Sequence, residues 1–309
     1  MQTPSAPTTI CRLEHYATLR VSGTDAQSFL QNLLSNDIRE VDASHAQRSS
    51  FNTAKGRMLA TFLVWQDGQD YMLQLPASLA QSMRKKLSMY VLRAKVTIAD
   101  SEMTALGLAG TDALQILPQA CGDMPAMGVL HLDELDAYAI RIDAARFELV
   151  AKDIESLWQR LSPKAQCTES QQWELHDIRS GIPTVLPATQ EQFVPQMANF
   201  DLIGGVNFKK GCYPGQEIVA RMHYLGKPKR RMYLAHVASE TAPLPGCDLY
   251  SAEMKDQSCG MIVNSASAPG GGYDVLAVVQ IESRNGDAVH LGSLQGEKLI
   301  FGELPYPIV

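Results

Sequence analysis

Apolar and polar residues near the N-terminus follow two different periods. The segment ATLRVSG at 17–23 alternates between apolar and polar residues, which is typical of a strand with one buried face. The segment TDAQSFLQNLLSND at 24–37 instead places its large apolar residues on one helical face, and Thr24 and Gln27 have the spacing of a capping box. The pattern therefore predicts a strand that leads directly into a helix.

The next stretch mixes strands and a helix in another order. The apolar pattern predicts strands at 57–65 and 70–75, a helix at 76–92 and a strand at 95–100. Asp67-Gly68 is a turn signal between the first two strands, and Ser78 is expected to open the helix, with Gln81 in capping-box spacing. Strand, strand, helix and strand indicate an antiparallel sheet with a helix on one face, not alternating βαβ units.

The spacing of apolar residues differs between the central and the C-terminal parts of the chain. Strands are predicted at 105–109, 137–143 and 146–151, and helices at 112–119, 153–161, 168–180 and from Pro214 to 222. Beyond residue 232 the helical period disappears, and short strands are predicted at 232–238, 260–267, 274–283 and 288–294. These strands are separated by Gly, Pro and Asp, so a small C-terminal β-barrel is expected.

Composition and charge exclude several classes of protein. The length of 309 residues favours two or three domains, and 45% apolar with 19% charged residues is ordinary for a globular protein. The net charge of −6 argues against indiscriminate binding to nucleic acid or acidic lipid. No run approaches the ~18 apolar residues of a membrane span. The N-terminus has neither a basic start nor an apolar signal core, so we expect a cytoplasmic protein.

The six cysteines are widely scattered and form no Cys-x-x-Cys pair: Cys11, Cys121, Cys167, Cys212, Cys247 and Cys259. Neither a disulfide framework nor a zinc or iron–sulfur ligand set is visible, so no metal site is predicted. Free thiols in a reducing compartment are expected.

Cys212 is the cysteine with a reason in the sequence to be reactive. It follows Lys209 and Lys210 and precedes Pro214, which we expect at the first position of a helix. Helix N-termini and nearby cations favour an anion, and both effects lower the pKa of a thiol. The alternative is that Cys212 is a small buried apolar residue.

The residues around Cys212 carry a resemblance to a known family. The run KGCYPGQEIVAR is similar to the signature of the YgfZ-type folate-binding proteins, which are relatives of the aminomethyltransferase (T-protein) of the glycine cleavage system. The signature residues are Lys210, Gly211, Cys212, Tyr213, Gly215, Gln216, Glu217 and Arg221. Taken singly, Glu217 and Arg221 have only the i,i+4 spacing of an ordinary helix-surface ion pair. SQQWELHDIRSGIP, NTAKGRML and ELPYPIV extend the resemblance over nearly the whole chain.

The resemblance implies an α+β, T-protein-like arrangement of three domains around a central opening that holds folate. The expected domains are a discontinuous folate-binding core at 1–50 and 101–225, an inserted ferredoxin-like portion at 51–100 that we leave open to extend further, and a C-terminal β-barrel at 228–309. Tetrahydrofolate or a related reduced folate is the implied cofactor.

Two aromatic residues that the family associates with folate fall on Tyr16 and Trp173. An indole or phenol face suits the flat rings of folate, although core packing is the alternative for Trp173. The run KPKRR supplies candidate anion-binding residues for the carboxylate tail of folate, or simply a solvated turn: Lys227, Lys229, Arg230 and Arg231.

Two positions depart from the family pattern. Relatives tend to have tryptophan at the position of Tyr16, and they often present a carboxylate where this chain has Arg179. A carboxylate accepts N–H bonds from a pterin, whereas a guanidinium only donates. Asp37 and Glu174 are available acids, but nothing in the sequence aims them at a ligand.

The resemblance implies a folate-binding accessory protein that supports the assembly or repair of iron–sulfur enzymes, including one that thiomethylates tRNA. Its expected partners are iron–sulfur proteins or their assembly machinery, and an enzymatic turnover of its own is not required. The alternative is a folate-dependent transferase of aminomethyl or methyl groups, which needs a positioned acid or base. Direct binding of tRNA through KPKRR is disfavoured by the net charge of −6 and by the lack of an aromatic RNA-reading motif.

Overall fold

A computed structural model of the chain describes residues 7–226, 228–254, 257–286 and 288–308. The chain divides into two compact units. The first unit comprises Met1–Gln31, Asp37–Arg48 and Phe62–Trp173, and the second comprises Asn32–Asn36, Ser49–Thr61 and Glu174–Val309. Each unit is therefore assembled from segments that are far apart in the sequence.

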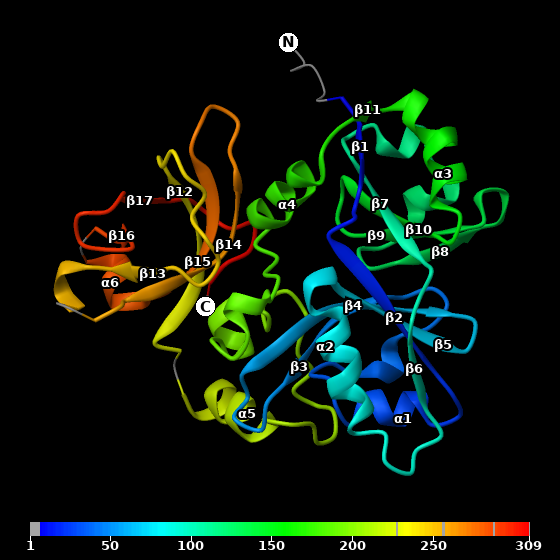
Figure 1. The fold of residues 1–309 in the computed structure, drawn as a ribbon, viewed down its shortest axis with the longest axis horizontal. Coiled ribbons are helices and arrows are strands. Elements are labelled where there is room, and N and C mark those ends of the chain that lie inside the picture. The colour runs from blue at the N-terminus through cyan, green and yellow to red at the C-terminus, as the bar shows by residue number, and fades with distance from the viewer. Residues whose placement is uncertain (1–6, 227, 255–256, 287, 309) are drawn as a thin grey trace. The chain divides into compact units, whose positions relative to one another are not determined.

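A six-stranded sheet lies in the first unit, with the strand order β11-β1-β7-β10-β9-β8. Its strands are β1 (Thr9–Arg12), β7 (Thr104–Ala109), β8 (Val129–Leu132), β9 (Ala137–Arg141), β10 (Arg146–Ala151) and β11 (Gln166–Cys167). Helix α3 (Ile154–Leu161) packs on β7 and β10 and buries Leu157 and Leu161 (Figure 1). The Asp153 side chain caps α3 by accepting a 3.0 Å hydrogen bond from Ser156 N, which stabilises a helix by about 1 kcal/mol.

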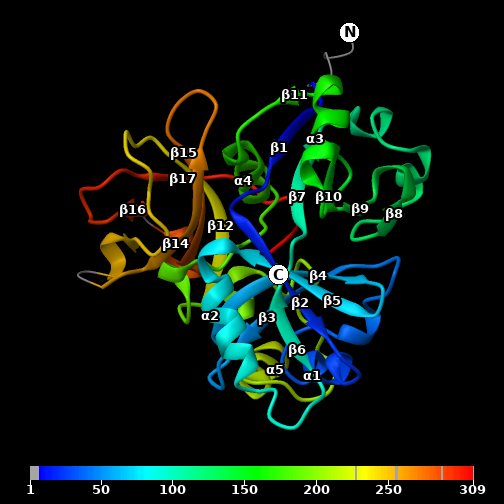
Figure 2. The same ribbon diagram turned by 45° about the vertical axis from the view of Figure 1, so that its right-hand side comes forward.

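A second sheet has five strands in the order β3-β4-β5-β2-β6. Its strands are β2 (Tyr16–Ser22), β3 (Gln47–Asn52), β4 (Met58–Asp67), β5 (Asp70–Pro76) and β6 (Thr97–Asp100). Helix α1 (Ala26–Gln31) follows β2, and helix α2 (Ala77–Ser88) packs on β2, β5 and β6 in the first unit (Figure 2). An antiparallel sheet with a helix on one face was predicted for this stretch, and the pairings of β5 with β4 and β2 and of β2 with β6 confirm it.

The C-terminal part of the second unit is a nearly closed six-stranded barrel with the order β16-β13-β14-β15-β12-β17. Its strands are β12 (Arg230–Val237), β13 (Asp248–Tyr250), β14 (Gly260–Ser267), β15 (Tyr273–Gln280), β16 (His290–Leu291) and β17 (Leu299–Phe301). The edge strands approach each other, since Leu299 N donates to Val289 O at 2.8 Å. Apolar residues of β12, β14 and β15 fill the interior, so the predicted C-terminal barrel is confirmed.

Three further helices belong wholly or partly to the second unit: α4 (Ser170–Arg179), α5 (Gln216–Leu225) and α6 (Ile281–Asn285). Among the described residues, none of the helices has the length and apolar character needed to cross a membrane. Sheets and helices together confirm the α+β class.

The predicted helix at 24–37 is too long. Only Ala26–Gln31 is helical. Ser35 N instead donates to Ser50 O at 2.9 Å, and the Ser35 hydroxyl donates to Gly205 O at 2.6 Å. Serine and asparagine compete with helices by making such bonds, so the chain leaves the helix before them.

Three other helix predictions need correction. The segment 112–119 forms two 3-10 turns, Ala113–Gln115 and Gln119–Asp123, because Pro118 interrupts the hydrogen-bond ladder. Helix α2 begins at Ala77 directly after Pro76, so Ser78 lies inside the first turn and does not open it. Helix α5 begins at Gln216 and not at Pro214.

Candidate functional site

Two glycine turns meet at the start of α5 in the second unit. Gly215 precedes α5 with φ +77°, the left-handed region that favours glycine. A Cβ added there would lie under 3.0 Å from the backbone of Gly56 and from the carbonyl O of Thr53. Gly56 itself has φ +71° and donates its N–H to Thr53 O at 2.9 Å in the turn between β3 and β4. We call this contact the glycine junction; it holds the chain before α5 directly against another backbone.

Lys210 is an internal residue of the second unit. Only 5% of its surface is exposed, and its ammonium group donates to Leu34 O at 2.6 Å and to Asn36 O at 2.9 Å. The same nitrogen lies 5.3 Å from the centroid of the buried Tyr213 ring, and burial raises the pKa of the Tyr213 phenol. Lys210 therefore ties the signature segment to residues 34–36. The charge predicted beside the thiol is engaged by these carbonyls, whereas Lys209 is exposed.

Cys212 lies exposed between these two anchors. Gly211 is exposed as well, and a Cβ added to it would have no neighbour within 4 Å. The thiol is thus not the small buried apolar residue of the alternative interpretation. Because Gly215 occupies the cap position, three residues separate Cys212 from the first residue of α5, which is farther than the sequence suggested.

The remaining signature residues lie on α5. Gln216 donates its amide to Lys210 O at 3.3 Å, so it reinforces the turn that carries Cys212. Glu217 and Arg221 are both exposed, and neither forms an ion pair with another residue in the described parts of the chain. The i,i+4 ion pair suggested by their spacing is therefore not formed, and both charges face solvent on the helix that follows the cysteine.

The residues of the basic run after α5 differ in their burial and in their ion pairs. Lys227 lies outside the described residues. Lys229 is exposed and Arg230 is half-buried at the start of β12. Arg231 points inward: 5% of its surface is exposed, and it forms an ion pair with Asp201 at 2.9 Å. Arg231 was a candidate anion-binding residue or part of a solvated turn; in the structure its charge is paired inside the second unit.

Trp173 is buried in the first unit, with 2% of its surface exposed. The ring packs so closely on Gly107 that a Cβ there would lie under 3.0 Å from three ring atoms. The Arg146 guanidinium lies over the ring, 5.1 Å from its centroid. The indole N–H is a buried donor with no hydrogen-bond partner among the described residues. Core packing therefore accounts for the ring of Trp173, and its N–H is buried without a hydrogen-bond partner among the described residues.

The two departures from the family pattern have different surroundings. Tyr16 is half-buried at the start of β2, and its ring lies 4.1 Å from the ring of His15. Arg179, at the end of α4, forms an ion pair with Asp274 at 2.8 Å, and Asp274 also binds His236 Nδ1 at 2.9 Å. The guanidinium at this unusual position thus pairs with a carboxylate of the barrel strand β15.

The two acidic residues Asp37 and Glu174 also have different surroundings. Asp37 is buried and accepts two hydrogen bonds from the Arg39 side chain, one of them 2.8 Å long. Glu174 has a raised pKa, chiefly because burial penalises its charged form and secondarily because Asp177 repels it. A carboxyl group with a raised pKa is a candidate acid or base, since it can hold or release a proton nearer to neutral pH.

The arrangement in the second unit presents an exposed thiol on a turn anchored at both ends. Of the described cysteines only Cys167 is also exposed, and it lies in the first unit. Within the described ranges, no cluster of three His, Cys, Asp or Glu side chains is suited to hold a metal ion. The exposed thiol can therefore act as a nucleophile or as a soft ligand toward a partner.

The chain has the fold of a glycine cleavage aminomethyltransferase. The family described as the GCVT N-terminal domain matches residues 6–153. The crystal structure of glycine cleavage system aminomethyltransferase T from Bartonella henselae superposes with a TM-score of 0.77 at 17% identity, covering 97% of this chain and 86% of that one. The predicted T-protein-like fold is confirmed.

The sequence relatives define the family more closely. A tRNA-modifying protein YgfZ from Sodalis glossinidius (strain morsitans) is 31% identical over 98% of this chain and 94% of its own length. Another, from Escherichia fergusonii, is 31% identical over 79% of this chain and 76% of its own length. The chain belongs to the family of YgfZ tRNA-modifying proteins, as its signature segment predicted.

Several residues of the site were not predicted from the sequence. Gly56 was singled out only as part of the segment NTAKGRML, and the carbonyls of Leu34 and Asn36 were not expected to bind Lys210. A backbone carbonyl has no side-chain signature, so no pattern could have found these two. The pairing of two positive-φ glycines, Gly56 and Gly215, was hinted at by turn-forming neighbours in both segments.

Proposed function

We propose that this protein is a folate-binding accessory protein that supports the assembly or repair of iron–sulfur enzymes, including one that thiomethylates tRNA. Its relatives carry the name tRNA-modifying protein YgfZ, and its fold is that of a glycine cleavage aminomethyltransferase. We further propose that it acts in the cytoplasm on iron–sulfur proteins or their assembly machinery.

The observation that carries this proposal is the exposed Cys212 on a turn anchored at both ends. Lys210 fixes one end to residues 34–36, and the glycine junction fixes the other end. A thiol needed only for packing would be buried, and a mobile loop would not require two such anchors. In the proposal, Cys212 contacts a partner protein, a cluster intermediate or the one-carbon group of folate.

The thiol is tested by replacing Cys212 with serine and measuring thiomethylated nucleosides in tRNA from cells that lack the endogenous protein. We expect Cys212→Ser to lose support for thiomethylation while the circular dichroism and unfolding midpoint stay unchanged. Cys167→Ser is the matched control, because it removes the other exposed thiol. Full support by Cys212→Ser would exclude a role for the thiol.

Reduced folate is the proposed ligand, with Tyr16 and Trp173 as contacts. The fit in this structure rests on the buried indole N–H of Trp173, which lacks a partner among the described residues and can donate to a polar atom of folate. Folate, when bound, supplies a carrier for one-carbon groups.

Titration with tetrahydrofolate tests the ligand through tryptophan fluorescence. Saturable quenching is expected in the wild type, with at least about tenfold weaker binding in Trp173→Phe, which keeps an aromatic ring and removes the buried donor. Trp158→Phe is the control, because Trp158 lies on α3 under Arg12. Equal affinity in all three proteins would remove Trp173 from the site, and no binding would remove folate.

A second candidate function is transfer of a one-carbon group onto tetrahydrofolate. The raised pKa of Glu174 favours it, because such chemistry needs a group that can hold or accept a proton. Incubation with tetrahydrofolate and methylamine donors would decide between the candidates. Methylenetetrahydrofolate formed at catalytic rates, and lost in Glu174→Gln, would establish the transferase; its absence in an otherwise folate-binding protein favours the accessory role.

A further inference from the structure

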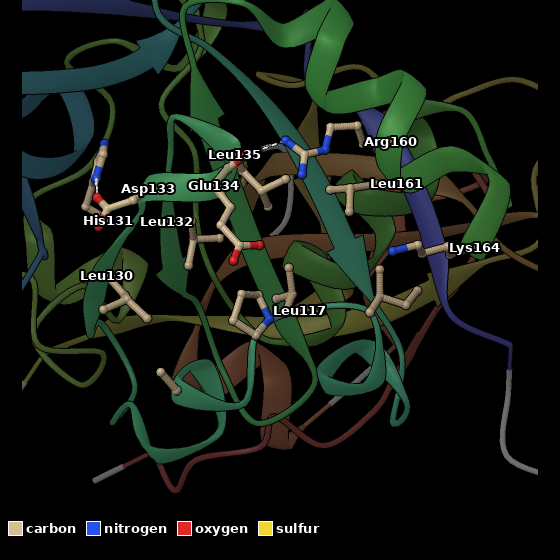
Figure 3. Close-up of a pocket in the computed structure, with 13 residues that line it drawn as sticks. Leu117, Leu130, His131, Leu132, Asp133, Glu134, Leu135, Arg160, Leu161 and Lys164 are labelled. Atoms are coloured by element: carbon tan, nitrogen blue, oxygen red, sulfur yellow. Dashed lines mark hydrogen bonds and ion pairs between the residues drawn. The ribbon is translucent and has the colours of Figure 1, made fainter.

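A cavity of about 650 Å³ opens in the first unit, away from the signature segment in the chain (Figure 3). Its walls are the 3-10 turns that follow β7, the end of β8 with the turn after it, and helix α3 with the residues that follow it. The volume falls within the roughly 300–1,000 Å³ of small-molecule sites. The proposed function does not use this cavity.

Leucines make up most of the apolar lining: Leu117, Leu130, Leu132, Leu135 and Leu161. Leu117, Leu132 and Leu161 are buried members of a hydrophobic core of the first unit. The floor of the cavity is therefore part of the core and is held in place by it. A floor of this kind is preformed, so an apolar ligand would gain burial without first ordering the protein.

Charged groups of both signs line this apolar floor. Arg160 and Lys164 come from α3 and the residues after it, and Glu134 comes from the turn after β8. In Figure 3 the Lys164 ammonium and the Glu134 carboxylate extend toward each other across the cavity. Arg160 Nη1 donates to the main-chain O of Glu134, which fixes the guanidinium at the rim.

None of these three side-chain charges is neutralised within the protein. Across the parts of the chain that the structure describes, Arg160, Lys164 and Glu134 form no ion pair. The Asp133 carboxylate lies within hydrogen-bond distance of His131 Nδ1, at 2.8 Å. Three unpaired charges around an apolar floor are complementary to a molecule that carries both signs.

We propose that this cavity binds a zwitterion with an apolar body, of the size of a dipeptide of leucine. The carboxylate of the ligand lies against Arg160 and Lys164, the ammonium group against Glu134, and the apolar side chains on the leucine floor. A fatty acid would satisfy the cations but would place its chain beside the Glu134 carboxylate, and an apolar amine would leave both cations unpaired. The zwitterion uses all three charges and the apolar floor.

The test follows leucine methyl signals by NMR in the full-length chain during titration with leucyl-leucine. We expect saturable shifts at Leu117, Leu132 and Leu161. N-acetyl-leucyl-leucine lacks the ammonium group and leucyl-leucine amide lacks the carboxylate, so each is expected to bind about fivefold more weakly. The two modified dipeptides test the ammonium contact and the carboxylate contact separately, without a change in the protein.

Variants assign each contact to a side chain. In Glu134→Gln the free and acetylated dipeptides should bind alike, and in Lys164→Gln the preference for the carboxylate should fall. Lys152→Gln is the control, since Lys152 is an exposed lysine outside the cavity. Absence of methyl shifts would overturn the proposal. Equal binding of all three dipeptides would overturn it as well, and so would undiminished affinity for N-acetyl-leucyl-leucine, which would indicate a site for a simple anionic amphiphile.

Discussion

Replacing Gly215 by alanine tests the glycine junction that holds the Cys212 turn. The left-handed backbone at φ +77° costs a non-glycine residue about 1–2 kcal/mol. The new methyl group would also overlap the backbone of Gly56 and Thr53, and overpacking of this kind costs about 1–3 kcal/mol. Together the substitution is expected to lower the free energy of unfolding of the second unit by about 2–5 kcal/mol.

Two other glycines of the second unit separate the cost of the left-handed backbone from the cost of the steric overlap. Gly204 has φ +75° with no atom within 4 Å of an added Cβ, so Gly204→Ala should cost only the backbone term of about 1–2 kcal/mol. Gly211 has neither a positive φ nor a close neighbour, so Gly211→Ala should stay within about 0.5 kcal/mol of the wild type.

Urea unfolding followed by circular dichroism and by tryptophan fluorescence measures all three variants. The two probes matter because the chain has two compact units that need not unfold together. A Gly215→Ala variant that loses no more stability than Gly204→Ala would refute the steric contact, and one as stable as Gly211→Ala would refute the left-handed turn as well.

Three further predictions concern buried charges and acids. Lys210→Met should lower the free energy of unfolding by about 2–4 kcal/mol, because two carbonyls lose a charged donor, while Lys209→Met should change it little by the same urea assay. Glu174→Gln should stabilise the protein at pH 7 but not at pH 4. The pKa of Glu174 is raised in the folded wild type, so the wild type loses stability as the pH rises through that pKa, whereas glutamine does not ionise. Thermal unfolding at both pH values checks this prediction. Burial raises the pKa of Tyr306 to about 12, so stability should fall between about pH 10 and 12 more in the wild type than in Tyr306→Phe, and equal slopes would contradict it.

The anchored turn also bears on how Cys212 would work. A thiol that must meet a partner or a bound one-carbon group benefits from a fixed position, since less conformational freedom is lost on contact. If Gly215→Ala folds but fails to support thiomethylation, placement of the thiol matters as well as its presence. If it supports thiomethylation fully, the junction serves stability alone.

Local pattern was sufficient for much of the fold. Strands such as β5 and β12, the helix α3 and the C-terminal barrel were predicted from the apolar pattern and from turn residues. These signals lie within a few residues of one another, so a single sequence displays them. The family signature around Cys212 was visible for the same reason.

Contacts between distant segments decided the length of the first helix and the burial of several charged groups. The helix at 24–37 ends early because Ser35 bonds to Gly205, 170 positions later, and Lys210 is buried because it reaches the carbonyls of Leu34 and Asn36. Arg231 pairs with Asp201, which local charge patterning did not indicate. The sequence by itself determined periodicity, caps and the signature, whereas tertiary structure decided which polar groups are buried, because their partners are brought near only by folding.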